Sequence, residues 1–192
     1  NGTTNETMNW STCTKIVDGW DFANSDRDPK DDYGHGTHVA GIIASNDSTY
    51  KGIAPDAKLI AMKVLDSVGS GFFSDVDAAI DWCTANKEKH NISVIAMSLG
   101  TSTTFSNSCD SSFPSTKASA LNAVGKGITV VAASGNSYSS TGISAPACLE
   151  NITSVGRTSN DDSVFSSSNG NSLLDFLAPG TAICSTQLPG YN

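Results

Sequence analysis

Short apolar runs alternate with helical patterns along most of the chain. Strands are predicted over residues 58–65, 93–99, 128–133, 152–157 and 173–177. A helix is predicted from Ser74, with Asp77 placed to complete a capping box, to about His90. A second helix is predicted over 115–126, where Gly127 fits the C-terminal stop. Strands this apolar are expected to be buried on both faces, and alternation with helices favours parallel pairing. The pattern therefore predicts one α/β domain, a doubly wound and mostly parallel sheet with helices on both faces.

A histidine opens a further stretch of small and apolar residues, Gly34-His35-Gly36-Thr37-His38-Val39-Ala40-Gly41. In the first turn of a helix, His35 would lie at the positive end of the helix dipole. That field disfavours imidazolium and helps to keep the ring neutral, as a general base must be. Gly36, Ala40 and Gly41 make the helix thin, so that other backbone can pack closely. The alternative is a capped core helix with an incidental histidine.

Composition narrows the possible functions. The 192 residues have 38% hydrophobic content, 16% charged content and a net charge of −8. An acidic chain without a basic cluster argues against nucleic-acid binding and against anionic membranes. No apolar run approaches the roughly 20 residues of a membrane span.

Three loops follow predicted strands, at the end of a parallel sheet where ligands bind. Val68–Gly71 follows the first of these strands, Ser98–Gly100 ends the second, and Ser134–Asn136 follows the third. Each turn alone is weak evidence, because glycine-rich turns commonly follow strands. Together with His35, the three loops favour a catalytic or binding site.

The run around His35 resembles the histidine motif of the subtilisin-like serine proteases. The resemblance extends over nearly the whole chain, through 15–22, 52–55, 130–136 and 177–180. It implies the fold of that family and a serine endopeptidase that forms an acyl-enzyme with a Ser-His-Asp triad. On this resemblance His35 is the general base, and the amide of Asn136 is the neutral donor of the oxyanion hole.

The resemblance also implies how a peptide binds. Two segments would flank an extended substrate by strand addition, and a third would complete the pocket for the side chain before the cleaved bond. The residues are Gly69, Ser70 and Gly71, then Ser98, Leu99 and Gly100, then Ala133, Ser134 and Gly135. Small uncharged walls favour an apolar or permissive side chain there. The expected partners are peptide or protein substrates, with no nucleic acid or membrane, and the protein is expected to be a secreted monomer.

No segment of the chain matches the family motifs that carry the aspartate and the serine of the triad. Val17-Asp18-Gly19 stands inside the stretch that resembles a later strand, so it does not match the aspartate motif. Gly142–Pro146 precedes the fourth predicted strand and opens no helix, so it does not match the serine motif. The 192 residues are therefore expected to be part of a peptidase domain and to be inactive alone. The alternatives are a non-catalytic peptide-binding pseudoprotease and a zinc protein built on His35, His38 and cysteines.

The resemblance finally implies a disulfide and suggests a metal site. On this resemblance Cys109 and Cys148 would pair. Cys83 lies with Ile80 on the apolar face of its predicted helix and is expected to be a buried free thiol, while Cys13 and Cys184 stay unassigned. Catalysis is expected to need no cofactor. A structural calcium ion is suggested by the spacing of oxygen ligands in a loop similar to one of thermitase-like subtilases, at Asp21, Asn24, Asp26 and Asp28. Lys30 departs from that pattern, and the alternative is a solvated acidic turn.

Overall fold

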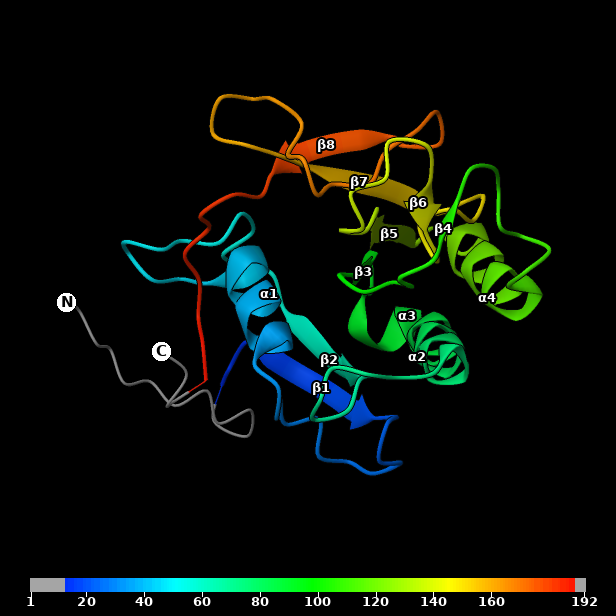
Figure 1. Ribbon diagram of the computed structural model, residues 1–192. Helices are drawn as coiled ribbons and strands as arrows, with labels where there is room; N and C mark the ends of the chain where they lie inside the picture. Colours follow the sequence, from blue (N-terminus) through cyan, green and yellow to red (C-terminus); the bar gives the residue numbers. More distant parts are fainter. Residues whose placement is uncertain (1–12, 189–192) are drawn as a thin grey trace. The chain divides into compact units, whose positions relative to one another are not determined.

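The structure, a computed structural model, describes residues 13–188 (Figure 1). The chain forms two compact parts: the first holds the residues up to Asp75 and those from Cys184 on, and the second runs from Val76 to Ile183. Each part has its own parallel sheet. In the portion that the structure describes, no helix is long and apolar enough to cross a lipid bilayer.

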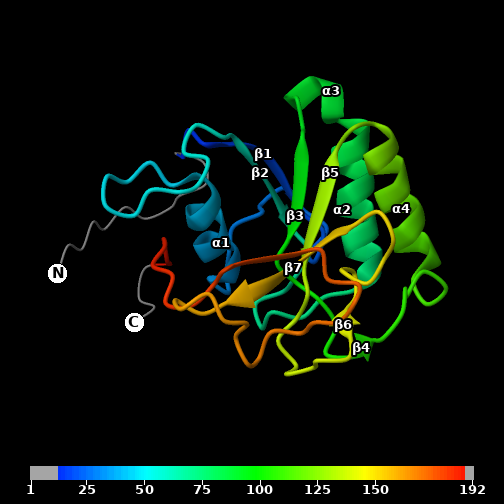
Figure 2. The same cartoon turned by 90° about the horizontal axis from the view of Figure 1, so that it is seen from above.

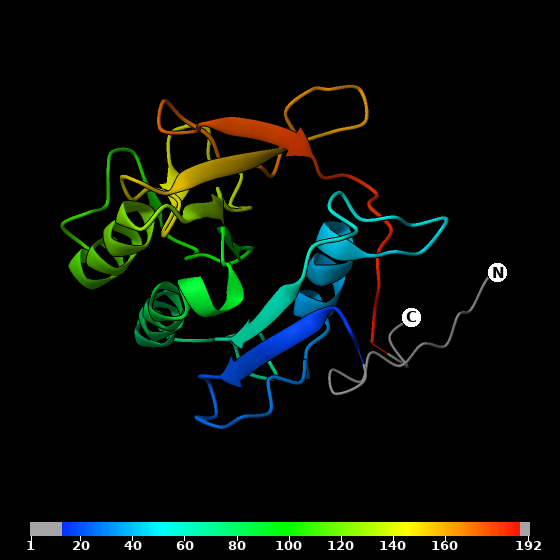
Figure 3. The same ribbon diagram turned by 180° about the vertical axis from the view of Figure 1, so that it is seen from behind.

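The first part is built on two parallel strands and one helix (Figure 3). Strand β1 spans Ile16–Asp21, strand β2 spans Leu59–Lys63, and helix α1 spans His35–Ala44. The small residues of α1 allow the close packing predicted from the sequence. A Cβ atom on Gly41 would overlap the hydroxyls of Ser185 and Thr186, which donate to backbone carbonyls of the helix.

The second part holds a four-stranded parallel sheet in the order β3-β5-β7-β8. The strands are β3 Val94–Met97, β5 Thr129–Ala133, β7 Thr153–Thr158 and β8 Phe176–Pro179. Helix α4 spans Pro114–Gly125, and Figure 2 shows it beside α2, Phe73–Ala85, along β5. These elements confirm the parallel α/β fold class expected from the sequence.

Burial along the sheet explains which strands were easiest to predict. Buried and half-buried residues alternate along β7, and Val130 and Ala132 of β5 are buried. The outer strands differ, since Val94 of β3 is 55% exposed and Phe176 of β8 is 63% exposed. The expectation that every strand is buried on both faces was therefore wrong for the two strands at the edges of this sheet.

The first predicted helix needs two corrections. It begins at Phe73, so Ser74 lies inside it, and the Ser74 hydroxyl contacts Asp75 instead of capping the helix. It also ends at Ala85, and a short helix α3, Lys87–His90, follows after Asn86. Asn86, with φ of −100° and ψ of 10°, departs from helical geometry and separates the two helices.

One antiparallel pair was not predicted. Strand β4, Thr104–Phe105, pairs with strand β6, Ile143–Ser144. Ile143, Ser144 and Ala145 are each 0% exposed. The segment that fails to match the serine motif is therefore part of the core of the second part.

Candidate active site

His35 is the first residue of α1, and its side chain is exposed. The first turn of this helix is bound by the carboxylate of Asp31. One oxygen accepts hydrogen bonds from the Gly34 and Tyr33 amides at 2.8 and 3.0 Å. The other accepts from the Thr37 amide and hydroxyl, both at 2.7 Å. Asp31 thus satisfies donors on both sides of His35 that a helix N-terminus leaves without intrahelical partners.

The same contacts change the pKa of Asp31. Burial by itself would raise the pKa of this carboxyl, but the hydrogen bonds from Gly34, Thr37 and Tyr33 outweigh burial and lower it. The charged form is therefore more stable in the folded protein than in the unfolded chain. Its contribution is fully present above the unfolded pKa, near 3.8, and is lost as the pH falls through the lower folded pKa.

Replacing Asp31 with alanine is expected to lower the free energy of unfolding by about 1–2 kcal/mol at pH 7, as loss of a helix cap does. The difference from wild type should shrink as the pH falls below 3.8. Urea unfolding between pH 7 and pH 3 measures it. The control is Asp32→Ala, because the Asp32 carboxylate faces Lys63 instead of α1. A loss that is the same at every pH would contradict the role of the charge.

The predicted substrate segment at Gly69 belongs to the same part as His35. Its loop is closed by Asp66, whose carboxylate accepts from the Ser70 amide at 2.9 Å and whose own amide donates to the Ser70 carbonyl at 2.7 Å. Gly69 has a φ of +76°, and a Cβ atom there would lie 2.8 Å from the Tyr33 ring. The loop therefore packs against a residue two positions before His35.

The other two substrate segments come together in the second part. Met97 pairs with Ala132 at the carboxyl ends of the parallel strands β3 and β5. Ser98 and Ala133 therefore follow side by side at that end of the two strands. Ser134 of one segment, and Thr101 directly after the other, also bond to the buried residues at β6. The Ala145 carbonyl accepts from the Thr101 amide at 2.9 Å, and the Ser144 amide donates to the Ser134 carbonyl at 2.9 Å.

Asn136 directly follows the segment Ala133–Gly135, and its side chain is exposed. The preceding residues explain why the loop needs glycine and serine. The Ser134 side chain is 1% exposed, and its hydroxyl donates to the Asn169 carbonyl. Gly135 has a φ of +99°, and a Cβ atom there would overlap the Ser144 hydroxyl and the Asn169 amide.

Alanine at Gly135 is expected to lower the free energy of unfolding by about 1–3 kcal/mol more than alanine at Gly127, the range for an overpacked core. The two glycines have φ values of +99° and +78°, so both variants strain the backbone. Only Gly135 adds a clash, because nothing lies within 4 Å of a Cβ atom on Gly127. Urea unfolding of both variants measures the difference, and equal losses would contradict the packing argument.

The candidate calcium loop is organised by its own contacts. Asp21 is 2% exposed, its carboxylate lies 3.3 Å from the Lys63 ammonium, and it accepts from the Asn24 amide and side chain. Asp26 accepts from the Asp28 amide. Between residues 13 and 188, no group of three or more His, Cys, Asp or Glu side chains is arranged to hold a metal ion. A lysine ammonium lies on the Asp21 carboxylate, which a calcium ion in this loop would need as a ligand.

Calcium binding by this loop is open to a direct test. We expect equal melting midpoints with calcium and with a chelator, because Lys63 already neutralises Asp21. Thermal melts of wild type and Asp26→Ala measure this. A calcium-dependent rise that Asp26→Ala abolishes would contradict the expectation and restore the calcium interpretation.

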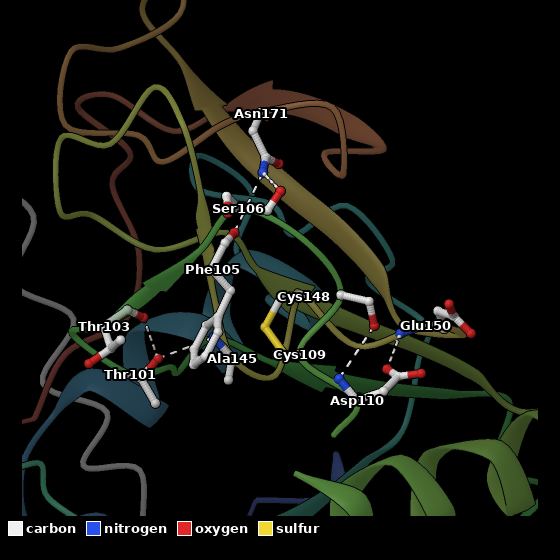
Figure 4. The surroundings of a disulfide bond; sticks show 11 residues. Thr101, Thr103, Phe105, Ser106, Cys109, Asp110, Ala145, Cys148, Glu150 and Asn171 are labelled. Atoms are coloured by element: carbon white, nitrogen blue, oxygen red, sulfur yellow. Dashed lines mark hydrogen bonds between the residues drawn. A yellow bond between two sulfur atoms is a disulfide. The ribbon is translucent and has the colours of Figure 1, made fainter. Parts of the chain in front are cut away.

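The disulfide implied by the family resemblance is present. Cys109 and Cys148 are bonded, with their Cα atoms 5.5 Å apart, and both residues are buried (Figure 4). The Cys109 amide donates to the Cys148 carbonyl at 3.1 Å, and the Asp110 carboxylate accepts from the Glu150 amide at 3.0 Å. Cys83 is a buried free thiol, as expected, and burial raises its pKa to about 11.

Two residues that organise these segments were not identified from the sequence. Asp31 binds the first turn of α1, and the only signal for it was its place in the polar loop before His35. Asn169 contacts the loop of Asn136 from far along the chain, and no local pattern pointed to it. His35 with Gly69–Gly71 belongs to the first part, and Asn136 with the other two segments belongs to the second.

Comparisons with known proteins agree with the motifs. A model of the subtilase family matches residues 3–191. Thermitase from Thermoactinomyces vulgaris is 39% identical over 175 residues, 90% of this chain and 58% of thermitase. The minor extracellular protease Epr of Bacillus subtilis (strain 168) is 36% identical over 179 residues, 92% of this chain and 26% of Epr.

A solved structure gives the same answer for the fold. The crystal structure of a cold adapted subtilisin-like serine proteinase matches with a TM-score of 0.75 and 33% sequence identity, covering 90% of this chain and 58% of that chain. The chain thus spans less than two thirds of the length of each of these three proteins. Matched by the family model over almost all of its residues, the chain belongs to the subtilase family.

Proposed function

We propose that the protein of which these residues form a part is a serine endopeptidase. The observation that carries the proposal is an arrangement in the second part. Ser98–Gly100 and Ala133–Gly135, two segments suited to a peptide, lie at the carboxyl ends of β3 and β5, and Asn136 follows the second of them. In the first part, His35 opens a helix whose first turn is held by Asp31. Family membership supports the same reaction class.

In the proposed reaction, the hydroxyl oxygen of a serine attacks the carbonyl carbon of the scissile peptide bond. Its proton passes to the neutral ring of His35, and the carbonyl oxygen becomes an oxyanion that accepts a hydrogen bond from the Asn136 amide. The C–N bond then breaks as His35 returns the proton to the leaving amine. Water repeats the sequence on the acyl-enzyme, with His35 again as base.

The proposal assigns the serine and the aspartate that orients His35 to sequence outside these 192 residues. Joint action of His35 and Asn136 is likewise part of the proposal, since the two residues belong to separate parts. It follows that the 192-residue chain by itself should not turn over a peptide.

Peptide binding is assigned to the segments predicted from the sequence, with one refinement. The Ser70 amide and carbonyl are engaged with Asp66, so backbone pairing with a substrate is expected from Gly71 rather than Ser70. The neighbouring walls, Ser98–Gly100 and Ala133–Gly135, carry no charge, which suits an apolar or permissive side chain. Likeness to a protein named as an extracellular protease supports secretion, and we propose a monomer that needs no cofactor for catalysis.

The proposal is tested by labelling with a serine-directed fluorophosphonate and by turnover of a peptide amide. The complete protein should be labelled and active, and His35→Ala should lose both properties because the serine is no longer activated. The 192-residue chain is the second control and should show neither. An unlabelled and inactive complete protein that still binds peptides would favour a pseudoprotease, and activity of the 192-residue chain alone would contradict the assignment of the serine.

A further inference from the structure

Asn169 lies behind the loop that carries Asn136, and its side chain is completely buried at 0% exposure. It belongs to the segment between β7 and β8, in the same compact part as that loop. A buried amide is costly unless its donors and acceptors are satisfied. The partners of Asn169 therefore indicate what the residue does.

The side-chain amide of Asn169 is fully engaged. Its Oδ1 atom accepts hydrogen bonds from the backbone amides of Ser137 at 2.8 Å and Ser139 at 3.1 Å. Its Nδ2 atom donates to the Ser134 carbonyl and to the Ser144 hydroxyl, both at 3.1 Å. Two donor hydrogens and two acceptor lone pairs are all that a primary amide offers.

The backbone of Asn169 binds the same loop. Its amide donates to the Gly135 carbonyl at 2.9 Å, and its carbonyl accepts from the Ser134 hydroxyl at 2.8 Å. Bonds to Asn169 therefore lie on both sides of Asn136, from Ser134 to Ser139, while the Asn136 side chain itself is exposed.

We propose that Asn169 is a positioning residue for Asn136. It holds the loop in one conformation, so that the exposed amide of Asn136 is already oriented when charge develops on the substrate. Preorganised donors of this kind lower the barrier because they do not have to reorganise during the reaction. This inference rests on the proposed role of Asn136 in catalysis.

Other side chains would not supply this set of bonds. Alanine offers no donor or acceptor to the loop. Aspartate could accept from Ser137 and Ser139, but its second oxygen would face the Ser134 carbonyl, where asparagine donates. A glycine at position 135 completes the fit, because a Cβ atom there would overlap the Asn169 amide.

The first test is kinetic and uses the complete peptidase. Asn169→Ala should lower kcat by roughly tenfold to a hundredfold with KM nearly unchanged, the effect of misplacing a catalytic group. In the Asn136→Ala background the same substitution should change kcat by less than about twofold, because the two residues act through one donor. Ser144→Ala removes one partner of Asn169 while keeping the backbone, and should lower kcat in the same direction by a smaller factor.

The second test measures the loop without using activity. Amide hydrogen exchange at Ser137 and Ser139, followed by NMR in a His35→Ala background to prevent autolysis, should become at least about tenfold faster in Asn169→Ala. Asn171→Ala is the matched control. Its side chain also donates to backbone carbonyls, but to those of Ser106 and Thr141 outside the bonds that Asn169 makes.

The outcomes separate this inference from the proposed function. Unchanged exchange at both serines in a folded Asn169→Ala protein would overturn it. An equal loss of kcat with and without Asn136 would also overturn it, because Asn169 would then act only on the fold. If Asn136→Ala alone left kcat unchanged, the proposed role of Asn136 would fail instead, and the exchange rates would still decide whether Asn169 holds the loop.

Discussion

Replacing Asn136 with alanine is expected to lower kcat of the complete peptidase by about 10²–10³-fold, the size known for loss of an oxyanion-hole donor in subtilisin. KM should hardly change, because the amide interacts more strongly with the oxyanion of the transition state than with the ground-state carbonyl. Asn136 suits this role because its side chain is exposed at the carboxyl end of β5. Steady-state turnover of a peptide amide substrate measures both constants.

The matched control is Asn160→Ala, which removes another exposed asparagine from the loop after β7. It should leave kcat and KM at the wild-type values, because nothing assigns Asn160 to substrate binding or to the reaction. A rise in KM with unchanged kcat in Asn136→Ala would contradict the oxyanion role and indicate ground-state binding. A wild-type kcat would remove Asn136 from the mechanism altogether.

The central strands of the second part were predictable because their apolar runs are buried. Val130 and Ala132 of β5 are each 1% exposed, so hydrophobicity alone marked the strand. Strand β8 begins at Phe176, later than the apolar run from Leu173 indicated. Just before β8, the Asp175 carboxylate accepts hydrogen bonds from the amide and hydroxyl of Ser154 in β7. A contact with a neighbouring strand cannot be predicted from the local sequence of β8.

Short pairings and distant contacts could not be predicted from local pattern. Strands β4 and β6 have two residues each, fewer than a periodic signal requires. The predicted helix start at Ser74 was wrong for a related reason. A serine before an apolar helix face is only one of several signals for a helix start, and α2 begins one residue earlier, at Phe73.

The candidate site shows the same division. His35 and the glycine-rich loops stand in contiguous motifs, so their positions at helix and strand ends were predictable from sequence. Asp31 and Asn169 act through the backbone of other residues, Asp31 on a turn that folds back to it and Asn169 across about thirty residues. Hydrogen-bond partners at such separations become visible only when the chain is folded.

Removing the disulfide with the double variant Cys109→Ser/Cys148→Ser is expected to lower the free energy of unfolding by on the order of 3–4 kcal/mol. The two cysteines are 39 positions apart, and in the chain-entropy model closing a loop of that length restricts the unfolded chain. The bridge lies beside the β4–β6 pair, where the Asn171 side chain also binds the Ser106 and Thr141 carbonyls.

Urea unfolding of the complete protein without reductant, in a His35→Ala background that prevents autolysis, measures the loss. Cys184→Ser is the control, because Cys184 is an exposed free cysteine and its replacement should leave the midpoint unchanged. Burial raises the pKa of Cys83 to about 11, so its thiolate is too scarce at neutral pH to exchange with the bridge. Adding reductant should bring wild type to the midpoint of the double variant. Equal midpoints for wild type and double variant without reductant would contradict a stabilising bridge, because closing the loop would then not change the free energy of unfolding.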